Sequence, residues 1–475
     1  MDFDELAEAT HDQLVTNWFN VYDKVQGDVV SQFVSKYRDN LPCKQQGVAC
    51  GSFNWVVRFE FEDGVEWIMR FPVPGKVVHP EEKMRREVDT IKFLEEQTSV
   101  PTPKLIAFGM ADELGLGPFT ISEYIHGTPL DKLWRTDPED PRSLLRTDIR
   151  DGELEGVYRQ VANIILELSE NPLDRIGSLC IEEGKFAVNS RPLTLKMNEV
   201  VRFGGVAIDG MSSIFLSGSS VAHKSSLDHL EPSFTSSAEY FNHVAQQTAD
   251  HLEKQRNSID GPYDARRRFK HRHRFQAMTA TYVDEAHSHG PFTLSCDDFR
   301  PANFILDANG KIWWIDLEWT YAAPYQMLYS PPRWLLLGSP CRWPEIPGFT
   351  DLFEPKFELF HRILVEEEAR RAEVKNHKLE SPLGELDGKQ SLSALMRKAM
   401  TDGKFWYHEL IRESFDFDDD FLWEKISQTS PLGGLADVEI DKGEMEAFVA
   451  RKVAVWREYE KEVTAKREQD EIKAV

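Results

Sequence analysis

The segment from residue 296 to residue 316, CDDFRPANFILDANGKIWWID, constrains the structure of this chain more than any other. Asn309-Gly310 lies between two apolar runs in it and is a strong signal for a two-residue hairpin turn. If these two residues form the turn, Ala308 pairs with Lys311 and, by the same count, Asn303 lies directly opposite Asp316. Cross-strand neighbours have Cβ atoms roughly 4.5–5.5 Å apart. The segment therefore predicts a hairpin that holds an amide oxygen beside a carboxylate.

The residue types in this segment suit phosphoryl transfer. Asn303 and Asp316 offer oxygen ligands, which Mg²⁺ prefers. Asp298, on the loop just before the hairpin, is placed to orient a hydroxyl nucleophile. A base, a metal-binding amide and a metal-binding carboxylate are the parts that kinases combine in this way. The competing interpretation is that Asp, Asn and Gly serve here only as ordinary turn residues.

Composition argues against several classes of partner. The chain has 475 residues, of which 41% are hydrophobic, enough for a substantial core in two or three domains or in one bilobal unit. A formal net charge of −24 disfavours binding to nucleic acid or to an anionic membrane surface. Five cysteines without CxxC spacing, and an acidic start without a signal-peptide pattern, favour a cytoplasmic protein. No apolar stretch reaches the roughly 20 residues of a membrane helix.

The hydrophobic pattern changes near residue 126. Residues 1–125 are expected to form a mostly β unit, with a glycine turn containing Gly47 and Gly51, helices at 11–40 and 80–97, and strands at 53–61, 65–71, 104–108 and 119–125. Residues 126–475 are expected to form a helical unit, with helices at 152–169, 236–256, 264–286, 352–372, 391–413 and 443–468 and a Gly/Ser-rich insertion at 203–235. The predicted fold class is α+β.

A carboxylate on the packing face of the helix at 80–97 indicates a second constellation. Met84, Val88 and Leu94 belong to the apolar stripe of this helix, and Glu87 falls within that stripe. A buried carboxylate is costly unless it is paired, and Arg70, near the end of the strand at 65–71, is the natural partner. Such a pair would position the phosphates of a nucleotide. The alternative is that Glu87 lies at the edge of the stripe and reaches solvent.

Two further segments are candidates for nucleotide contacts. The glycine turn, at Gly51 and Ser52, would bring backbone N–H groups close to phosphates. Backbone groups that meet an adenine ring are expected at the strand end between the two units, at Glu123, Tyr124 and Ile125. Each segment is explained equally simply as an ordinary turn or connecting strand.

The order of these motifs resembles the aminoglycoside phosphotransferase/choline kinase-like superfamily, and within it a fungal branch of the phosphotransferase enzyme family. The similar motifs are WIMRFP, the helix glutamate, PTP, SEYIHG, Asp-x4-Asn, IDLEW and PPRWLL, spread over roughly residues 40–345. The resemblance implies a two-lobed, protein-kinase-like fold and phosphorylation of a small-molecule hydroxyl by ATP, with GTP not excluded. Carried over by position, it makes Asp298 the catalytic base, Asn303 and Asp316 the Mg²⁺ ligands, and Arg70 a phosphate-binding residue partnered by Glu87.

Two departures from the family pattern bear on activity. Cys296 stands where the loop usually begins with His, and a thiol is a weak hydrogen-bond donor for bracing the metal loop. Arg70 stands where many kinases have Lys. These departures keep open a catalytically weak, nucleotide-binding pseudokinase as the second interpretation. A protein kinase is disfavoured, because Leu317-Glu318 follow Asp316 where Phe-Gly is expected.

Two runs of charge remain. The basic run at 266–274 is interpreted as pairing with the chain's own acids, with an anionic partner as the alternative. The acidic run at 416–420 is interpreted as a solvated helix cap, with recognition of an amine-bearing acceptor as the alternative.

Overall fold

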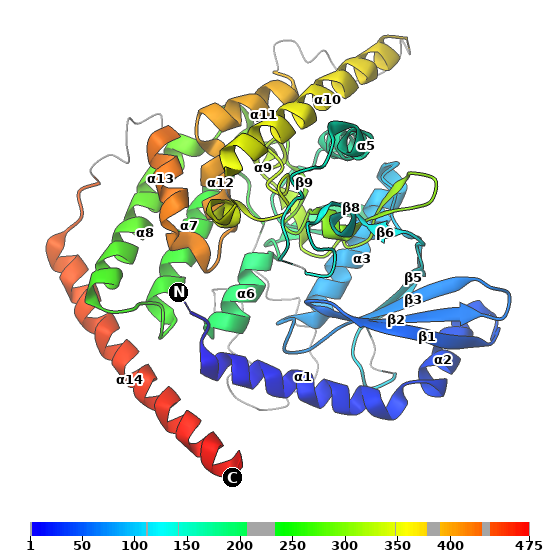
Figure 1. Cartoon of the computed structure of the whole chain (residues 1–475), viewed down its shortest axis with the longest axis horizontal. Helices are drawn as coiled ribbons and strands as arrows, with labels where there is room; N and C mark the ends of the chain where they lie inside the picture. Colours follow the sequence, from blue (N-terminus) through cyan, green and yellow to red (C-terminus); the bar gives the residue numbers. More distant parts are fainter. Residues whose placement is uncertain are drawn as a thin grey trace.

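An antiparallel sheet in the order β1-β2-β3-β5-β4 forms the N-terminal part of the protein (Figure 1). The computed structural model describes residues 2–110, 113–140, 142–206, 233–346, 348–377, 390–429 and 438–474. Aromatic and β-branched residues, which favour strands, fill β2 and β3. The sheet consists of β1 (Cys43–Cys50), β2 (Asn54–Phe61), β3 (Glu66–Pro72), β4 (Leu105–Gly109) and β5 (Phe119–Glu123).

Side-chain alternation in β3 decides which way Arg70 points. Trp67, Met69 and Phe71 are buried in one cluster with residues of α1 (Glu5–Val25) and α2 (Asp28–Ser35). Successive side chains of a strand face opposite sides of the sheet, so Arg70 faces away from α1 and α2. It faces α3 (Pro80–Gln97) instead, whose bounds agree with the predicted helix and whose first residue is proline.

The rest of the chain is mainly helical and encloses the largest hydrophobic core. The long helices at its centre are α5 (Asp151–Ser169), α7 (Ser237–Lys254), α8 (Pro262–Tyr282) and α10 (Phe349–His377). The remaining helices are α4 (Leu130–Trp134), α6 (Leu195–Gly204), α9 (Tyr325–Leu328), α11 (Leu392–Thr401), α12 (Lys404–Arg412), α13 (Asp420–Thr429) and α14 (Lys442–Ala474). The α+β class, with a small sheet-rich lobe and a larger helical lobe, is confirmed, while the boundary at residue 125 stays a prediction.

Short antiparallel strands carry the loops of interest between the two lobes. The strand β9 (Thr293–Cys296) pairs with β12 (Thr320–Ala323), and the hairpin β10 (Phe304–Leu306) and β11 (Ile312–Trp314) extends to β6 (Thr128–Pro129). A separate pair is formed by β7 (Ser178–Glu182) and β8 (Lys185–Ser190). The segment 297–303 thus begins where β9 ends, and Asp316 lies between β11 and β12.

Three sequence expectations about elements were wrong. Gly47 lies within β1, at an irregularity in its pairing with β2, because this exposed strand lacks the apolar alternation that marks a strand. The helix expected at 391–413 is two helices, interrupted at Gly403, whose positive φ of 80° starts α12. The expected two-residue turn has three residues, Ala308 to Gly310, with Gly310 in the left-handed region and Asp307 accepting from the backbone N–H of Lys311.

The basic and acidic runs pair with each other, as expected for the basic run. Arg268 and Arg272 of α8 bind the buried carboxylate of Asp418, which also accepts from Nδ1 of His271 at 2.9 Å. Arg267 reaches Asp420 at 2.9 Å. The interpretation of 416–420 as only a solvated cap was therefore wrong for Asp418, which is 5% exposed.

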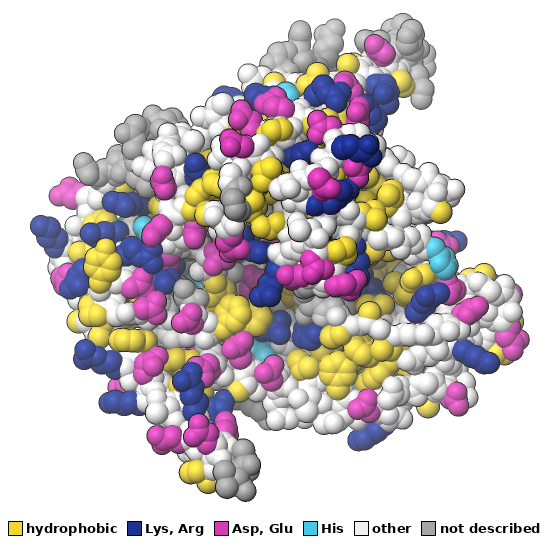
Figure 2. All heavy atoms as spheres, viewed as in Figure 1, with side chains coloured by type: hydrophobic (Ala, Val, Ile, Leu, Met, Phe, Trp, Pro, Cys, Tyr) yellow, Lys and Arg dark blue, Asp and Glu magenta, His cyan; other side chains and the backbone are white. Residues whose placement is uncertain are grey.

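Figure 2 shows acidic and basic side chains interspersed over the described part of the face in view. None of the described helices is both long and apolar enough to span a membrane. Most of the predicted insertion at 203–235 lies outside the described residues.

Candidate active site

Arg70 joins the two lobes through two carboxylates. Its Nη1 lies 2.6 Å from Oε1 of Glu87 on α3, and its Nη2 lies 2.9 Å from Oδ1 of Asp316. The predicted Arg70–Glu87 pair is therefore confirmed. Burial opposes the charge on Glu87, but Arg70 and Lys83 together hold the pKa of that carboxyl below its ordinary value. A guanidinium suits this position because its fork can bind two carboxylates at once.

The loop 297–303 presents Asp298 and fixes it from two sides. Nδ2 of Asn303 donates to both the backbone oxygen of Asp298, at 2.8 Å, and its Oδ2, at 2.9 Å. Nε of Arg300 lies 2.7 Å from Oδ1 of Asp298. Burial raises the pKa of Asp298, and the negative charge of Asp316 adds to this effect. Asp298 and Asp316 are therefore close enough to interact electrostatically.

The three-residue turn changes the predicted pairing of Asn303. Phe304 pairs with Trp314 and Leu306 with Ile312, one position away from the expected register. The backbone oxygen of Asn303 accepts from the N–H of Ile315 at 3.0 Å, so Asn303 lies opposite Ile315. The prediction that Asn303 directly faces Asp316 was wrong by one residue, because Asn303 lies opposite Ile315, the residue that precedes Asp316.

The donor set at this hairpin end fits Mg²⁺. Asn303 uses its amide nitrogen for Asp298, which leaves the amide oxygen for a cation. Asp316 binds Arg70 through Oδ1, and its side chain keeps 21% exposure. One amide oxygen and one partly exposed carboxylate are ligands of the type that Mg²⁺ takes, with water or phosphate oxygens completing its shell. Asn303 and Asp316 would hold such an ion.

Cys296, at the end of β9, bonds to the segment that follows Asp316, although a thiol is a weak hydrogen-bond donor. Its buried Sγ donates to the backbone oxygen of Glu318 at 3.3 Å. Burial raises the pKa of Cys296 well above its ordinary value, so the group stays a thiol and keeps its hydrogen. The thiol thus makes a hydrogen bond between the end of β9 and the segment that follows Asp316.

The sequence interpretation missed three polar residues next to this site. Lys83, Glu318 and Asn54 are all buried and hydrogen-bonded to one another. Lys83 and Glu87 lie four residues apart on one helix face, and Glu318 follows Asp316 at a spacing of two. These spacings could have indicated from the sequence that Lys83 and Glu318 belong to the site, because residues at i, i+4 of a helix lie side by side.

The other predicted nucleotide contacts occupy the expected places in the sheet. Gly51 is in the turn between β1 and β2, where its N–H donates to the backbone oxygen of Asn54 at 2.9 Å, and Ser52 follows it, exposed. Glu123 is the last residue of β5 and pairs with Trp67, and Tyr124 and Ile125 follow the strand, which was expected to continue to residue 125. Within the described residues, the side-chain bonds of Arg70 go to Glu87 and Asp316 and not to either segment, so their part in binding stays a prediction.

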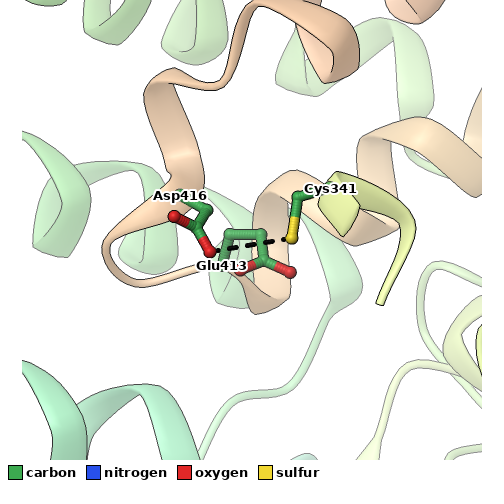
Figure 3. Close-up of side chains that lie close together, drawn as sticks. All are labelled: Cys341, Glu413 and Asp416. Carbon is green, nitrogen blue, oxygen red and sulfur yellow. Dashed lines mark hydrogen bonds between the residues drawn. The ribbon is translucent and has the colours of Figure 1, made fainter. Parts of the chain in front are cut away.

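A group of carboxylates lies on the helical side of the loop. Figure 3 shows Cys341, Glu413 and Asp416 pointing toward one another, with Sγ of Cys341 3.6 Å from Oδ2 of Asp416. Burial raises the pKa of Glu413 to about 7, although Arg333 lies 2.8 Å away. Burial also raises the pKa of Glu199 on α6, and the charge of Asp298 contributes to that rise. Glu199 therefore interacts electrostatically with Asp298 on one side and with Glu413 and Asp416 on the other.

A family model matches part of the chain. Residues 46–150 match the family model described as the phosphotransferase enzyme family, which confirms the resemblance predicted from the motifs over that part. The matched segment contains Gly51, Arg70 and Glu87 and ends before the loop of Asp298. No curated protein matches the chain.

Some solved structures also match most of the chain, at low identity. An ethanolamine kinase of Plasmodium vivax is 11% identical, with 91% of this chain and 89% of that chain covered and a TM-score of 0.42. A thermostable mutant of the aminoglycoside phosphotransferase APH(4)-Ia, solved with AMP-PNP and hygromycin B, is 14% identical, with 89% and 98% covered and a TM-score of 0.39. Because these similarities are low, the function of this chain is inferred from its own side chains.

Proposed function

We propose that this chain, whose residues 46–150 match the phosphotransferase enzyme family, transfers the γ-phosphoryl group of ATP or GTP to a hydroxyl group of a small acceptor. One observation carries the proposal: Arg70 binds the helix carboxylate of Glu87 and the loop carboxylate of Asp316 at the same time. Protein kinases depend on an ion pair between a strand cation and a helix glutamate, together with an aspartate that binds Mg²⁺.

Each residue of the group has a separate task. Arg70 would hold nucleotide phosphates, while Glu87 would orient the guanidinium of Arg70 by accepting its hydrogen bond. Asn303 and Asp316 would hold Mg²⁺, which supplies positive charge to the phosphate oxygens when bound. Asp298, fixed by Asn303 and Arg300, would orient the acceptor hydroxyl and accept its proton.

The acidic group on the helical side favours an acceptor that carries an amine. Glu199 interacts electrostatically with both Asp298 and Asp416, Glu413 interacts with Glu199, and Arg333 already has Glu409 and Glu413 as partners. Burial raises the pKa values of Glu199 and Glu413, and carboxyls of this kind gain most from an added cation. An ammonium group bound there would place a hydroxyl of the same molecule near Asp298.

Two variants separate the proposed tasks. Asp298→Ala should lower the rate of phosphoryl transfer by roughly 10²- to 10⁴-fold, the usual worth of a general base, with Mg-nucleotide affinity nearly unchanged. Asp316→Ala should weaken Mg-nucleotide binding itself. Isothermal titration with Mg-AMP-PNP measures the binding, and a coupled assay over amino alcohols, aminoglycosides and neutral sugars measures the transfer. Asp284→Ala is a matched control, because Asp284 is a hydrogen-bonded carboxylate outside this group.

Equal loss of nucleotide binding in both variants would contradict the separate tasks. Wild-type protein that binds Mg-nucleotide but transfers phosphate to no acceptor would favour the pseudokinase. Transfer to neutral sugars but not to amines would keep the kinase and reject the acceptor class.

A further inference from the structure

Lys83 is a buried cation that the proposed reaction does not yet use. Its side chain is 1% exposed, and its Nζ contacts three acceptors from three different elements. These acceptors are Oε2 of Glu87 on α3, at 3.3 Å, Oδ1 of Asn54 at the start of β2, at 3.0 Å, and Oε2 of Glu318. Glu318 belongs to residues 316–319, which lie between β11 and β12, include Asp316 and are called the metal loop below. All three N–H groups of the ammonium are thereby used, which is the condition for burying a lysine at tolerable cost.

The same point ties the glycine turn to the metal loop. Nδ2 of Asn54 donates to Oε2 of Glu318 at 2.9 Å, so Asn54 and Lys83 bind the same carboxylate oxygen. Next to them, the rings of Phe53 and Trp319 pack edge to face with centroids 5.1 Å apart. The turn after Gly51, the helix α3 and the residues after Asp316 therefore converge on one buried cluster.

The metal loop requires these fixing contacts, because its backbone is strained. Trp319 has a φ of 62°, in the left-handed region, and a bulky residue with positive φ is a genuine outlier. Strained residues of this kind persist only where the surrounding contacts over-determine them. Glu318, immediately before Trp319, is the residue that Lys83 and Asn54 fix, so these bonds hold the segment that follows Asp316.

Lys83 also serves the partner of Arg70. Glu87 gives Oε1 to Arg70 and Oε2 to Lys83. When Arg70 turns to phosphate oxygens, Glu87 still has Lys83 as a counter-charge and remains in place. A single buried lysine thus supports both the carboxylate that orients Arg70 and the loop that carries Asp316.

We propose that Lys83, through its bond to Glu318, is a positioning residue that holds Asp316 in the geometry required for binding Mg²⁺ with the nucleotide. This inference depends on the proposed function, because it assigns Lys83 a role in the same site. Supporting residues behind a metal ligand typically contribute 10- to 100-fold to metal affinity or activity. Lys83→Met removes the ammonium but keeps an unbranched side chain of similar length.

The test compares nucleotide affinity with and without magnesium. Lys83→Met should weaken AMP-PNP binding by about 10- to 100-fold in the presence of Mg²⁺ and by much less in its absence. Glu318→Gln should have a similar effect, and the double variant should lose little more than either single variant, because both act through one bond. Lys452→Met is the matched control, since Lys452 is also a buried lysine but binds backbone oxygens of Glu253 and Gln255.

Hydrogen–deuterium exchange of the wild-type and variant proteins gives a readout that needs no ligand. Amides of residues 316–320 should exchange faster in Lys83→Met, while those of β2 and β3 stay protected. An equal loss of affinity with and without Mg²⁺, or unchanged exchange at 316–320, would overturn the inference. Wild-type protein that binds no nucleotide would refute the proposed function, whereas the exchange experiment would still decide whether Lys83 holds the metal loop.

Discussion

At the scale of single residues, Cys296 illustrates how a small side chain can fit where a ring is usual. Its thiol is buried and already bonded to the backbone oxygen of Glu318. Cys296→His would force a larger ring into this packed position and should cost about 1–3 kcal/mol of unfolding free energy. Cys296→Ser keeps a donor at nearly the same place and should retain most of the transfer rate. Urea unfolding and the transfer assay check both.

The opposite result for these variants would be informative. A His variant as stable as wild type and more active would mean that the position has room for the ring and that the thiol bond braces the loop poorly. Cys180→Ser provides a control for replacing a buried thiol, since Cys180 bonds to the backbone oxygen of Ala187 in the β7–β8 pair.

The site residues that could be predicted from the sequence were those whose residue type does not fit the pattern of their neighbours along the chain. Glu87 stood out because a carboxylate interrupts an apolar helix stripe, and its need for a partner led to Arg70. Lys83 and Glu318 did not stand out, because a charged residue at the start of a helix or after a strand ordinarily reaches solvent. Their burial arises only when α3 and the metal loop meet, which is a tertiary event.

At the scale of elements, the short helix α12 and the turn after it bring Glu413 to the acidic group. In the folded protein burial raises the pKa of Glu413 to about 7, against 4.5 ordinarily. Binding of an ammonium group requires the ionised carboxylate, so acceptor affinity should rise as pH increases from 6 to 8. Glu413→Gln should remove most of this dependence, and Glu424→Gln, on the exposed side of α13, should not.

The carboxyl of Glu413 should also make the unfolding free energy depend on pH, in the opposite direction to acceptor affinity. Because the folded state holds the proton of Glu413 more tightly than the unfolded chain does, the unfolding free energy should fall as pH rises between about 4.5 and 7. Glu413→Gln should flatten this part of the stability profile, measured by urea unfolding at each pH. A profile identical to wild type, with unchanged acceptor affinity, would place Glu413 outside the acceptor site.

Elements were predictable where the apolar period was long, and their ends were not. The bounds of α3 agreed with the sequence because Pro80 and the prolines at 101 and 103 delimit a clear stripe. The hairpin after Asn303 shifted by one residue because Asp307 accepts from the backbone N–H of Asn309 and Lys311 and so lengthens the turn. Turn signals identify where a chain reverses, but side-chain hydrogen bonds such as these set the register.

At the scale of the whole molecule, α1 connects the two lobes. In Figure 1 it starts at the N-terminus beside α6 and runs along the sheet toward α2. Its far end is anchored by Trp18 and Tyr22, which are buried against the sheet. The near end is held by the helical lobe, because Nδ2 of Asn257 donates to the backbone oxygen of Phe3 at 2.9 Å and the ring of Phe3 stacks on Phe203 at 4.2 Å.

A helix anchored at both ends should limit how far the lobes separate, and this can be tested from the near end. The double variant Phe3→Ala/Asn257→Ala removes the stacked ring and the hydrogen bond but leaves Trp18 and Tyr22 in place. It should lower the unfolding free energy by about 2–3 kcal/mol, the sum expected for the ring contacts of Phe3 with Phe203 and Phe415 and for the partly buried hydrogen bonds of Asn257. Tyr263→Ala, at a position 82% exposed, is the control and should be neutral.

Lobe separation itself should change in the same double variant. Small-angle scattering should show a larger radius of gyration without nucleotide, and Mg-AMP-PNP should reduce it toward the wild-type value, because ligand contacts from both lobes replace the missing anchor. Unchanged scattering together with lowered stability would mean that α1 supports the fold without restraining the lobes. Unchanged stability as well would mean that Phe3 and Asn257 add nothing to the connection, and that other contacts of the near end, such as the bond from the N–H of Asp4 to the backbone oxygen of Phe203 at 2.6 Å, hold α1 there.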